Sequence, residues 1–181
     1  MTYYFGIPHE FKDDFSGSPS MLAFEVYGSR EDLYETHLNS GPMQAFLPAA
    51  GAVMSTGLDL THYEDKSGFL DRSGNCKEAG IFYDTRITSK SAAATATLLE
   101  KLAKLAKYVD DNEQGAYTFL VVKSLDSEDQ IRIFERYESW DALQKHLASK
   151  ELADLLLGSK EEIKSLEGRT YVPNQKGWLH R

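Results

Sequence analysis

The sequence predicts an α+β fold built from two ferredoxin-like repeats in tandem, and two observations support this prediction. The first is an internal repeat: residues 21–47 and 131–157 each contain a strand ending in Phe-Glu-x-Tyr and then a helix carrying a histidine. The second is the β-α-β-β-α-β order expected over residues 81–172, which is the ferredoxin-like order. Each repeat spans about half the chain, so a duplicated domain is expected and not a solenoid.

The strand–helix unit of the second copy shows why a histidine is expected to point inward. Period two predicts a strand over residues 131–137 with Glu135 and Tyr137 on one face. Ser139 is a suitable N-cap for the helix that follows, because its hydroxyl can accept from free amides of the first turn. His146 shares a helical face with apolar neighbours, so its imidazole should lie beneath the strand. His37 is its counterpart in the first copy.

The first half begins with a strand expected over residues 2–7, which are rich in β-branched and aromatic types. Turn residues follow, and a second strand is expected over 21–27. A helix over 30–39 is broken by a Gly-Pro pair, and a short helix over 43–47 comes next. Alternating apolar residues predict a strand over 57–64.

The second half is more complete. A strand is expected over residues 81–88, and a long helix capped by Ser89 or Ser91 follows it. A strand rich in β-formers is expected over 116–123. The repeated strand–helix unit follows, and a closing strand is expected over 169–172.

Seven strands are expected, whereas two whole copies would give eight. The predicted division is a first repeat over 1–66 that lacks its leading strand and helix, a linker over 67–79 and a complete second repeat over 80–181. A missing strand leaves an uncovered sheet edge, which is a liability. The Phe69-Leu70 segment could cover it, or a second chain in a homodimer, or a longer form of the protein.

Composition limits the classes of function. The net charge of −8 and the pI near 5.1 disfavour binding to a phosphate backbone, so no nucleic-acid partner is expected. Cys76 is alone and excludes an internal disulfide. The sequence shows no secretory signal and no apolar run of membrane-spanning length, so a cytoplasmic protein without a membrane partner is expected.

Several cofactor motifs are absent from the sequence. It contains no Gly-rich phosphate loop, no CxxC, no HExxH and no nucleophile elbow. The five histidines have no metal-ligand spacing, and the stretch 65–78 lacks the oxygen ligands of an EF-hand. Neither a nucleotide cofactor nor a metal site is expected.

The repeated motif resembles the strand–helix signature of antibiotic biosynthesis monooxygenase (ABM) domains. The matching residues of the second copy are Phe134-Glu135-x-Tyr137-x-Ser139 and Ala142-Leu143-x-x-His146-Leu147-x-Ser149. The first copy matches more loosely, through Phe24-Glu25-x-Tyr27 and His37-Leu38-x-Ser40. The resemblance covers nearly the whole chain as a fused pair, except for the start of the first copy.

The resemblance implies a pseudo-dimeric α+β barrel, with antiparallel sheets facing each other and helices outside. Family enzymes oxidise phenolic polyketides such as anthrones with molecular oxygen and use neither metal nor flavin, so no cofactor is implied. The deprotonated phenol itself reduces oxygen, which requires an apolar pocket, a base and donors for the developing anion. The implied partners are a small aromatic substrate and molecular oxygen.

Candidate catalytic residues are His146 and its counterpart His37, because imidazole titrates near neutral pH. Glu135 and Tyr137 join them as strand residues on the inward face. A core histidine and a structural ion pair are the alternative interpretations. Candidate substrate-binding residues are Tyr27, Glu25, Tyr83, Tyr117, Trp140, His62 and Arg86. Aromatic residues at strand spacing also suit a plain core.

Two other functions remain open from the sequence. The first is a lyase, cyclase or isomerase that acts on similar substrates without oxygen. The second is a non-catalytic, ligand-binding barrel of the stress-responsive type, because fold alone does not settle function.

Overall fold

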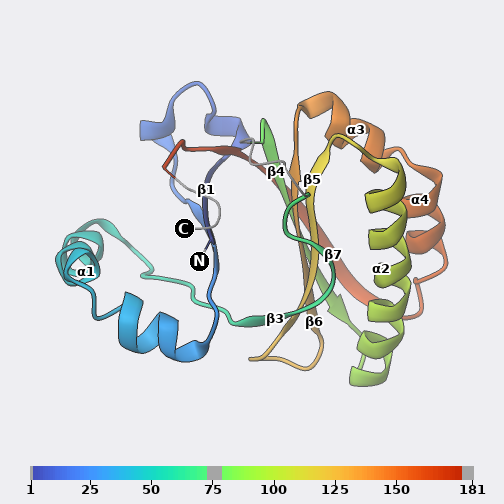
Figure 1. Ribbon diagram of the computed structural model, residues 1–181, viewed down its shortest axis with the longest axis horizontal. Coiled ribbons are helices and arrows are strands. Elements are labelled where there is room, and N and C mark those ends of the chain that lie inside the picture. Colours follow the sequence, from blue (N-terminus) through green and yellow to red (C-terminus); the bar gives the residue numbers. More distant parts are fainter. Residues whose placement is uncertain (1, 73–78, 177–181) are drawn as a thin grey trace.

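A single curled antiparallel sheet organises the protein (Figure 1). The computed structural model describes residues 2–72 and 79–176. Within them seven strands pair in the order β2-β1-β7-β4-β6-β5-β3. The strands are β1 (Thr2–Pro8), β2 (Leu22–Val26), β3 (Tyr63–Phe69), β4 (Ile81–Ser89), β5 (Ala116–Ser124), β6 (Gln130–Tyr137) and β7 (Ile163–Pro173). The expected α+β class, with an antiparallel sheet and helices outside it, is confirmed.

The second half folds as the order of its elements predicts. Its four strands pair as β7-β4-β6-β5, and the helices α2 (Ala92–Asn112), α3 (Trp140–Leu147) and α4 (Lys150–Leu157) cover one face (Figure 1). Ser91 caps α2 by accepting a hydrogen bond from the amide of Ala94. The apolar stripe of α2, formed by Leu98, Leu102, Leu105, Ala106 and Val109, is buried against the sheet.

The strands of the first half extend this sheet at both ends. β1 pairs with β7 through Gly6–Pro8 and carries β2 on its other side. β3 pairs with β5 at the opposite end. If the first half lacks its leading strand, β1 and β3 are its second and fourth strands, just as β5 and β7 are in the second half. Each half's second strand then pairs with the other half's fourth strand.

Among the described residues the edge strands of the sheet are therefore β2 and β3, and a leading strand of the first half, corresponding to β4 of the second, would lie between them. The division of the chain into repeats stays a prediction. β3 crosses the boundary expected at residue 66.

The strand expected over residues 57–64 is displaced toward the C-terminus. It begins at Tyr63 and ends at Phe69, where Phe69 pairs with Phe119 of β5. A bulge between Asp65 and Ser67 and a positive φ of 94° at Gly68 let this polar segment continue as an edge strand. A Cβ at Gly68 would lie 1.9 Å from the carbonyl oxygen of Phe119. Phe69 thus extends β3 itself and forms no separate strand.

Three other elements differ from the prediction in length or type. The helix expected over 30–39 is a π-helical segment, Asp32–His37. The short helix expected over 43–47 is part of α1 (Gly41–Val53), which contains Pro48. The closing strand expected over 169–172 begins earlier, at Ile163. The prediction missed its first part because residues 164–169 are exposed and lack the alternation that marks a half-buried strand.

Two groups of buried side chains lie on the two faces of the sheet. The larger packs under α2 and α3 and includes Leu98, Leu102, Phe119, Ile133 and Leu143. The other lies on the concave face and consists largely of rings: Tyr4, Phe24, Phe82, Tyr117, Phe134 and Tyr171. Among the described residues, no helix has the length and apolarity needed to cross a membrane.

Candidate functional site

His146 lies on the buried face of α3, between two carboxylates. Its Nδ1 is 2.9 Å from Oε2 of Glu113, and its Nε2 is 3.6 Å from Oε2 of Glu135. The Tyr137 hydroxyl donates to the same Glu135 oxygen at 2.6 Å. Alternation on β6 brings Glu135 and Tyr137 to this face, and the helical spacing of α3 brings His146 beneath them. The sequence predicted that Glu135, Tyr137 and His146 share this face, and Glu113 was not a candidate; a catalytic role for the group stays a prediction.

Burial controls the protonation of this group. Removal from water raises the pKa of Glu135 to about 7, against the opposing effects of the nearby His146 charge and the Tyr137 hydrogen bond. Burial opposes protonation of His146, but the hydrogen bond to Glu113 and the charge of Glu135 outweigh it and raise the pKa of His146. His146 and Glu135 are each only 2% exposed, so a substrate cannot reach them without local opening.

The first half builds the same group a second time. Tyr27 donates to Oε2 of Glu25 at 2.5 Å, as Tyr137 does to Glu135. The ring of His37 lies 5.6 Å from that of Tyr27 and 5.5 Å from that of Tyr3. His146 lies at 5.6 Å from the rings of Tyr137 and Phe119. Tyr3 pairs with Glu25 in register just as Phe119 pairs with Glu135, so the two sets correspond residue by residue.

The set in the first half differs from that in the second in two ways: hydrogen bonds link its glutamate to its histidine through two tyrosines, and it is more exposed. Glu25 accepts from Tyr27, Tyr27 is hydrogen-bonded to Tyr3, and the Tyr3 hydroxyl lies 3.3 Å from Nδ1 of His37. Burial and these bonds raise the pKa of Tyr27. Glu25, Tyr27 and His37 are half-buried, because no helix of the described residues covers them as α2 covers the second set. Water and small molecules can therefore reach this set.

The concave face of the sheet carries charged residues that sequence reasoning missed. Arg132 donates to both carboxylate oxygens of Asp84, and all these groups are buried. Arg136 donates to Oγ1 of Thr118 at 2.8 Å, and its guanidinium lies 4.5 Å from the centre of the Tyr4 ring. The signal was the Arg-x-Phe-x-Arg alternation on β6, on a strand whose other face was already assigned to the core.

The remaining candidates are scattered over the molecule. Tyr83 lies opposite Glu135 in register, with its hydroxyl over Gly168, and is half-buried. Tyr117 sits at a β-bulge that turns its ring to the concave face. Trp140 is exposed at the start of α3 and stacks on His9. Arg86 points away from Tyr83, as expected, and contacts Asp84 from an exposed position.

His62 belongs to a different group. Its Nε2 lies 2.6 Å from the hydroxyl of Tyr34, and its Nδ1 lies 3.0 Å from Oδ2 of Asp126. Neither Tyr34 nor Asp126 was a candidate from the sequence, because they lie in separate turns and helices and no local spacing links them to His62.

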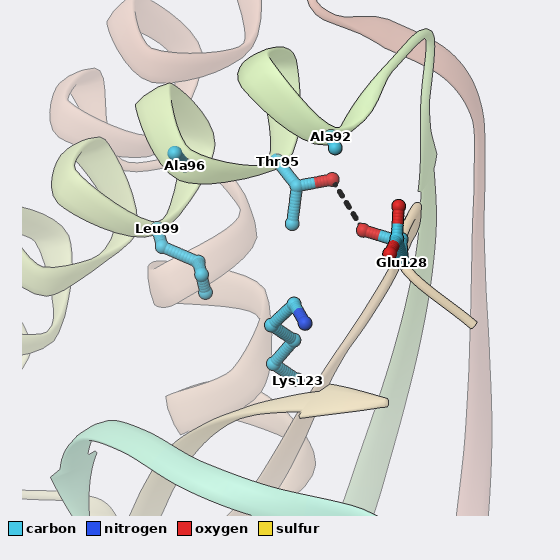
Figure 2. Close-up of a pocket in the computed structure, with 6 residues that line it drawn as sticks. All are labelled: Ala92, Thr95, Ala96, Leu99, Lys123 and Glu128. Atoms are coloured by element: carbon cyan, nitrogen blue, oxygen red, sulfur yellow. Dashed lines mark hydrogen bonds between the residues drawn. The ribbon is translucent and has the colours of Figure 1, made fainter. Parts of the chain in front are cut away.

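A surface hollow of about 300 Å³ lies at the start of α2 (Figure 2). It is lined by Ala92, Thr95, Ala96, Leu99, Lys123 and Glu128. The Thr95 hydroxyl donates to the Glu128 carbonyl at 3.0 Å, which ties the β5–β6 turn to the helix. None of the predicted site residues lines this hollow.

Residues 84–155 match the family described as antibiotic biosynthesis monooxygenase, so the resemblance seen in the sequence is confirmed over this segment. No curated protein matches the chain. Among solved structures, a provisionally assigned monooxygenase from Fusobacterium nucleatum superposes with a TM-score of 0.77 at 14% identity, covering 99% of this chain and 79% of its own.

Two further structures are similar. A provisionally assigned monooxygenase from Lactobacillus acidophilus has a TM-score of 0.74 at 14% identity, covering 96% of this chain and 76% of its own. A provisionally assigned antibiotic biosynthesis monooxygenase from Deinococcus radiodurans has a TM-score of 0.51 at 20% identity. It covers 56% of this chain and 99% of its own. At these identities the likeness shows a shared fold.

Proposed function

We propose that this chain, whose residues 84–155 form an ABM domain, is a cofactor-independent monooxygenase acting on a phenolic small molecule of the aromatic polyketide type. The observation that carries the proposal is the duplicated Glu-Tyr-His set, which is sealed in one half and reachable in the other. A base that takes a proton from a substrate must be within reach of it. His37 is therefore the proposed base, and His146 is its buried structural counterpart.

The hydrogen-bonded chain sets the proton on His37. A carboxylate can only accept, so Tyr27 donates to Glu25 and can accept from the Tyr3 hydroxyl. The oxygen of Tyr3 then accepts from Nδ1–H of His37. This order leaves the lone pair of Nε2 free to take the proton of a phenol.

In the proposed reaction the substrate is the reductant. The deprotonated ring carbon passes two electrons to oxygen and forms a C–O bond, which gives a hydroperoxide after protonation. Loss of water from this hydroperoxide breaks the O–O bond and the remaining C–H bond and forms the carbonyl group, so the substrate supplies all four electrons. The half-buried ring of Tyr27, which packs edge-on against the buried ring of Tyr3, supplies an apolar edge against which a flat substrate can pack.

The test is to incubate the protein with an anthrone under air and to follow quinone formation and oxygen uptake. His37→Gln should lower kcat about 100-fold, because it removes the base. Its melting temperature should stay near that of the wild type, since the side chain is half-buried.

His146→Gln is the matched control for this test. It leaves Glu135 and Glu113 without their cation and should lower stability, with turnover retained by the folded fraction. Loss of turnover in His146→Gln but not in His37→Gln would contradict the assignment. Product formed equally under nitrogen would indicate the lyase or isomerase alternative.

A second candidate is a non-catalytic ligand-binding barrel. Rings fill the concave face, where Phe24 stacks on Phe134 with centroids 3.9 Å apart, and Phe134 is fully buried. A filled interior favours a structural core over a substrate cavity. Binding of an anthrone without oxygen uptake would support this second candidate.

A further inference from the structure

Tyr34, His62 and Asp126 form a connected hydroxyl–imidazole–carboxylate group on the side of the molecule where the two halves meet. Tyr34 lies on the π-helical segment Asp32–His37, and π-helical turns are frequent at functional sites. His62 precedes β3, and Asp126 lies in the turn after β5. Three separate parts of the chain thus converge on one imidazole.

The carboxylate fixes the tautomer of the imidazole. Asp126 accepts from the backbone N–H of His62 at 2.7 Å and lies 3.0 Å from its Nδ1. These bonds, the backbone bond first, lower the pKa of Asp126 and keep it ionised. Because a carboxylate can only accept, Nδ1 carries the hydrogen, and Nε2 accepts from the Tyr34 hydroxyl at 2.6 Å. The imidazole is thus placed to remove the phenol proton.

A cation, Arg30, and an exposed apolar residue, Leu125, adjoin the group. The guanidinium of Arg30 lies 4.9 Å from the centre of the Tyr34 ring, where its positive charge would stabilise the negative charge of a developing phenolate. The side chains of His62 and Asp126 are 19% and 47% exposed, so solutes can reach the relay. Leu125 is the neighbour of Asp126 in the chain and is 58% exposed, and its backbone N–H donates to the carbonyl of His62 at 2.9 Å, so an exposed apolar residue adjoins the relay.

We propose that Tyr34 is the nucleophile of a second active site that hydrolyses activated esters with small apolar acyl groups. This proposal does not depend on the function proposed for His37. A nucleophile within hydrogen-bond reach of a base, with the base oriented by a third group, is the arrangement used in covalent acyl transfer.

The reaction has two steps. Oη of Tyr34 bonds to the acyl carbon while its proton passes to Nε2 of His62, and the bond to the leaving oxygen breaks. Protonated His62 returns that proton to the leaving group. Water, deprotonated by His62, then splits the acyl-tyrosine and restores the phenol. The overall change is ester plus water to acid plus alcohol.

The probes are p-nitrophenyl acetate and p-nitrophenyl butyrate with the full-length chain. Release of p-nitrophenol is followed by absorbance, and the acylated residue is located by peptide mass spectrometry after a rapid acid quench. The expected result is one acyl group on Tyr34. Tyr34→Phe keeps the ring over Arg30 and should lower release about 100-fold, and so should Asp126→Asn, because the tautomer is lost.

Two further variants sharpen the test. Tyr108→Phe is the matched control, since its half-buried hydroxyl is hydrogen-bonded to Glu151 and not to a histidine, and its release rate should equal that of the wild type. Leu125→Ser should lower the ratio of the butyrate rate to the acetate rate. The expected decrease is about fourfold for each methylene of the butyryl chain that packs on the leucine in the wild type. Acylation of lysines with Tyr34 unmodified would overturn the proposal, and so would wild-type release by Tyr34→Phe. Location of the adduct in the wild type needs no variant to fold.

Discussion

At the scale of single residues, β6 is unusual because it buries charge on both faces. Glu135 faces the helices, whereas Arg132 and Arg136 face the concave side. The alternation of the sequence predicted which residues share a face. It did not predict that both faces are buried, because that depends on β1 and β2, which reach β6 only through the curl of the sheet.

Glu135 should make stability depend on pH. Its pKa rises from an ordinary value of 4.5 to about 7 in the folded protein, so the folded state binds the proton more tightly than the unfolded chain. Stability should therefore fall as pH rises from 4.5 through about 7. The raised pKa of His146 acts in the same direction, because its contribution is complete below 6.5 and is lost as pH rises through the raised value.

The measurement is the urea midpoint at about pH 5.5 and about pH 8.5. The wild type should have the lower midpoint at the higher pH. Glu135→Gln should show a smaller difference between the two. Glu25→Gln, at the equivalent half-buried position, should keep the wild-type difference. An equal pH dependence in wild type and Glu135→Gln would contradict the assignment.

At the scale of elements, one arginine holds the end of α2. Arg72 donates through Nε to the carbonyl of Ala116 at 2.7 Å and through its other nitrogens to those of Asp110, Val109 and Glu113. The carbonyls of Val109 and Glu113 also accept from the backbone N–H groups of Glu113 and Ala116, so the guanidinium adds a second donor there and ties the end of the helix to the start of β5. No local pattern could predict this contact, because Arg72 lies far from these residues in the sequence.

Arg72→Ala should lower the free energy of unfolding by about 2–3 kcal/mol, because charged hydrogen bonds to buried acceptors are lost. Arg72→Lys should fall between this variant and the wild type, since an ammonium cannot reach all four carbonyls at once. Chemical denaturation monitored by circular dichroism measures both. A midpoint of Arg72→Ala equal to that of the wild type would show that water replaces the guanidinium without cost.

The strands β1 and β2 of the first half and the elements β4, α2, β5 and β6 of the second were predicted closely, whereas β3, the helices of the first half and β7 were not. β4, α2, β5 and β6 carry strong apolar periodicity because they bury a face against one another. β3 is polar and depends on a bulge and on Gly68, which sequence periodicity does not detect. The candidate site follows the same rule: the Glu-Tyr-His sets were found by local spacing, and the Tyr34–His62–Asp126 group was not.

At the scale of the whole molecule, the two halves should differ in local stability. α1 buries only Ala50, whereas α2 buries six side chains against the sheet. Amides of α1 should therefore exchange by local opening, at least about 100-fold faster than the central amides of α2. Hydrogen exchange followed by mass spectrometry measures both helices in one experiment. Equal protection of the two would indicate that another surface covers α1, such as that of a second chain, which is one of the alternatives left open by the sequence.

The reciprocal pairing also has a mechanical consequence. Among the described residues, β1 meets β7 through three residue pairs, Gly6–Pro173, Ile7–Val172 and Pro8–Tyr171, and the N–H of Asn174 donates to the carbonyl of Phe5 beyond them. Because β1 and β7 run antiparallel, tension on the two ends of the polypeptide loads these pairs in succession and not together. The molecule should consequently unzip at low force from its termini, and β1 and β2 should detach while the second half is still folded.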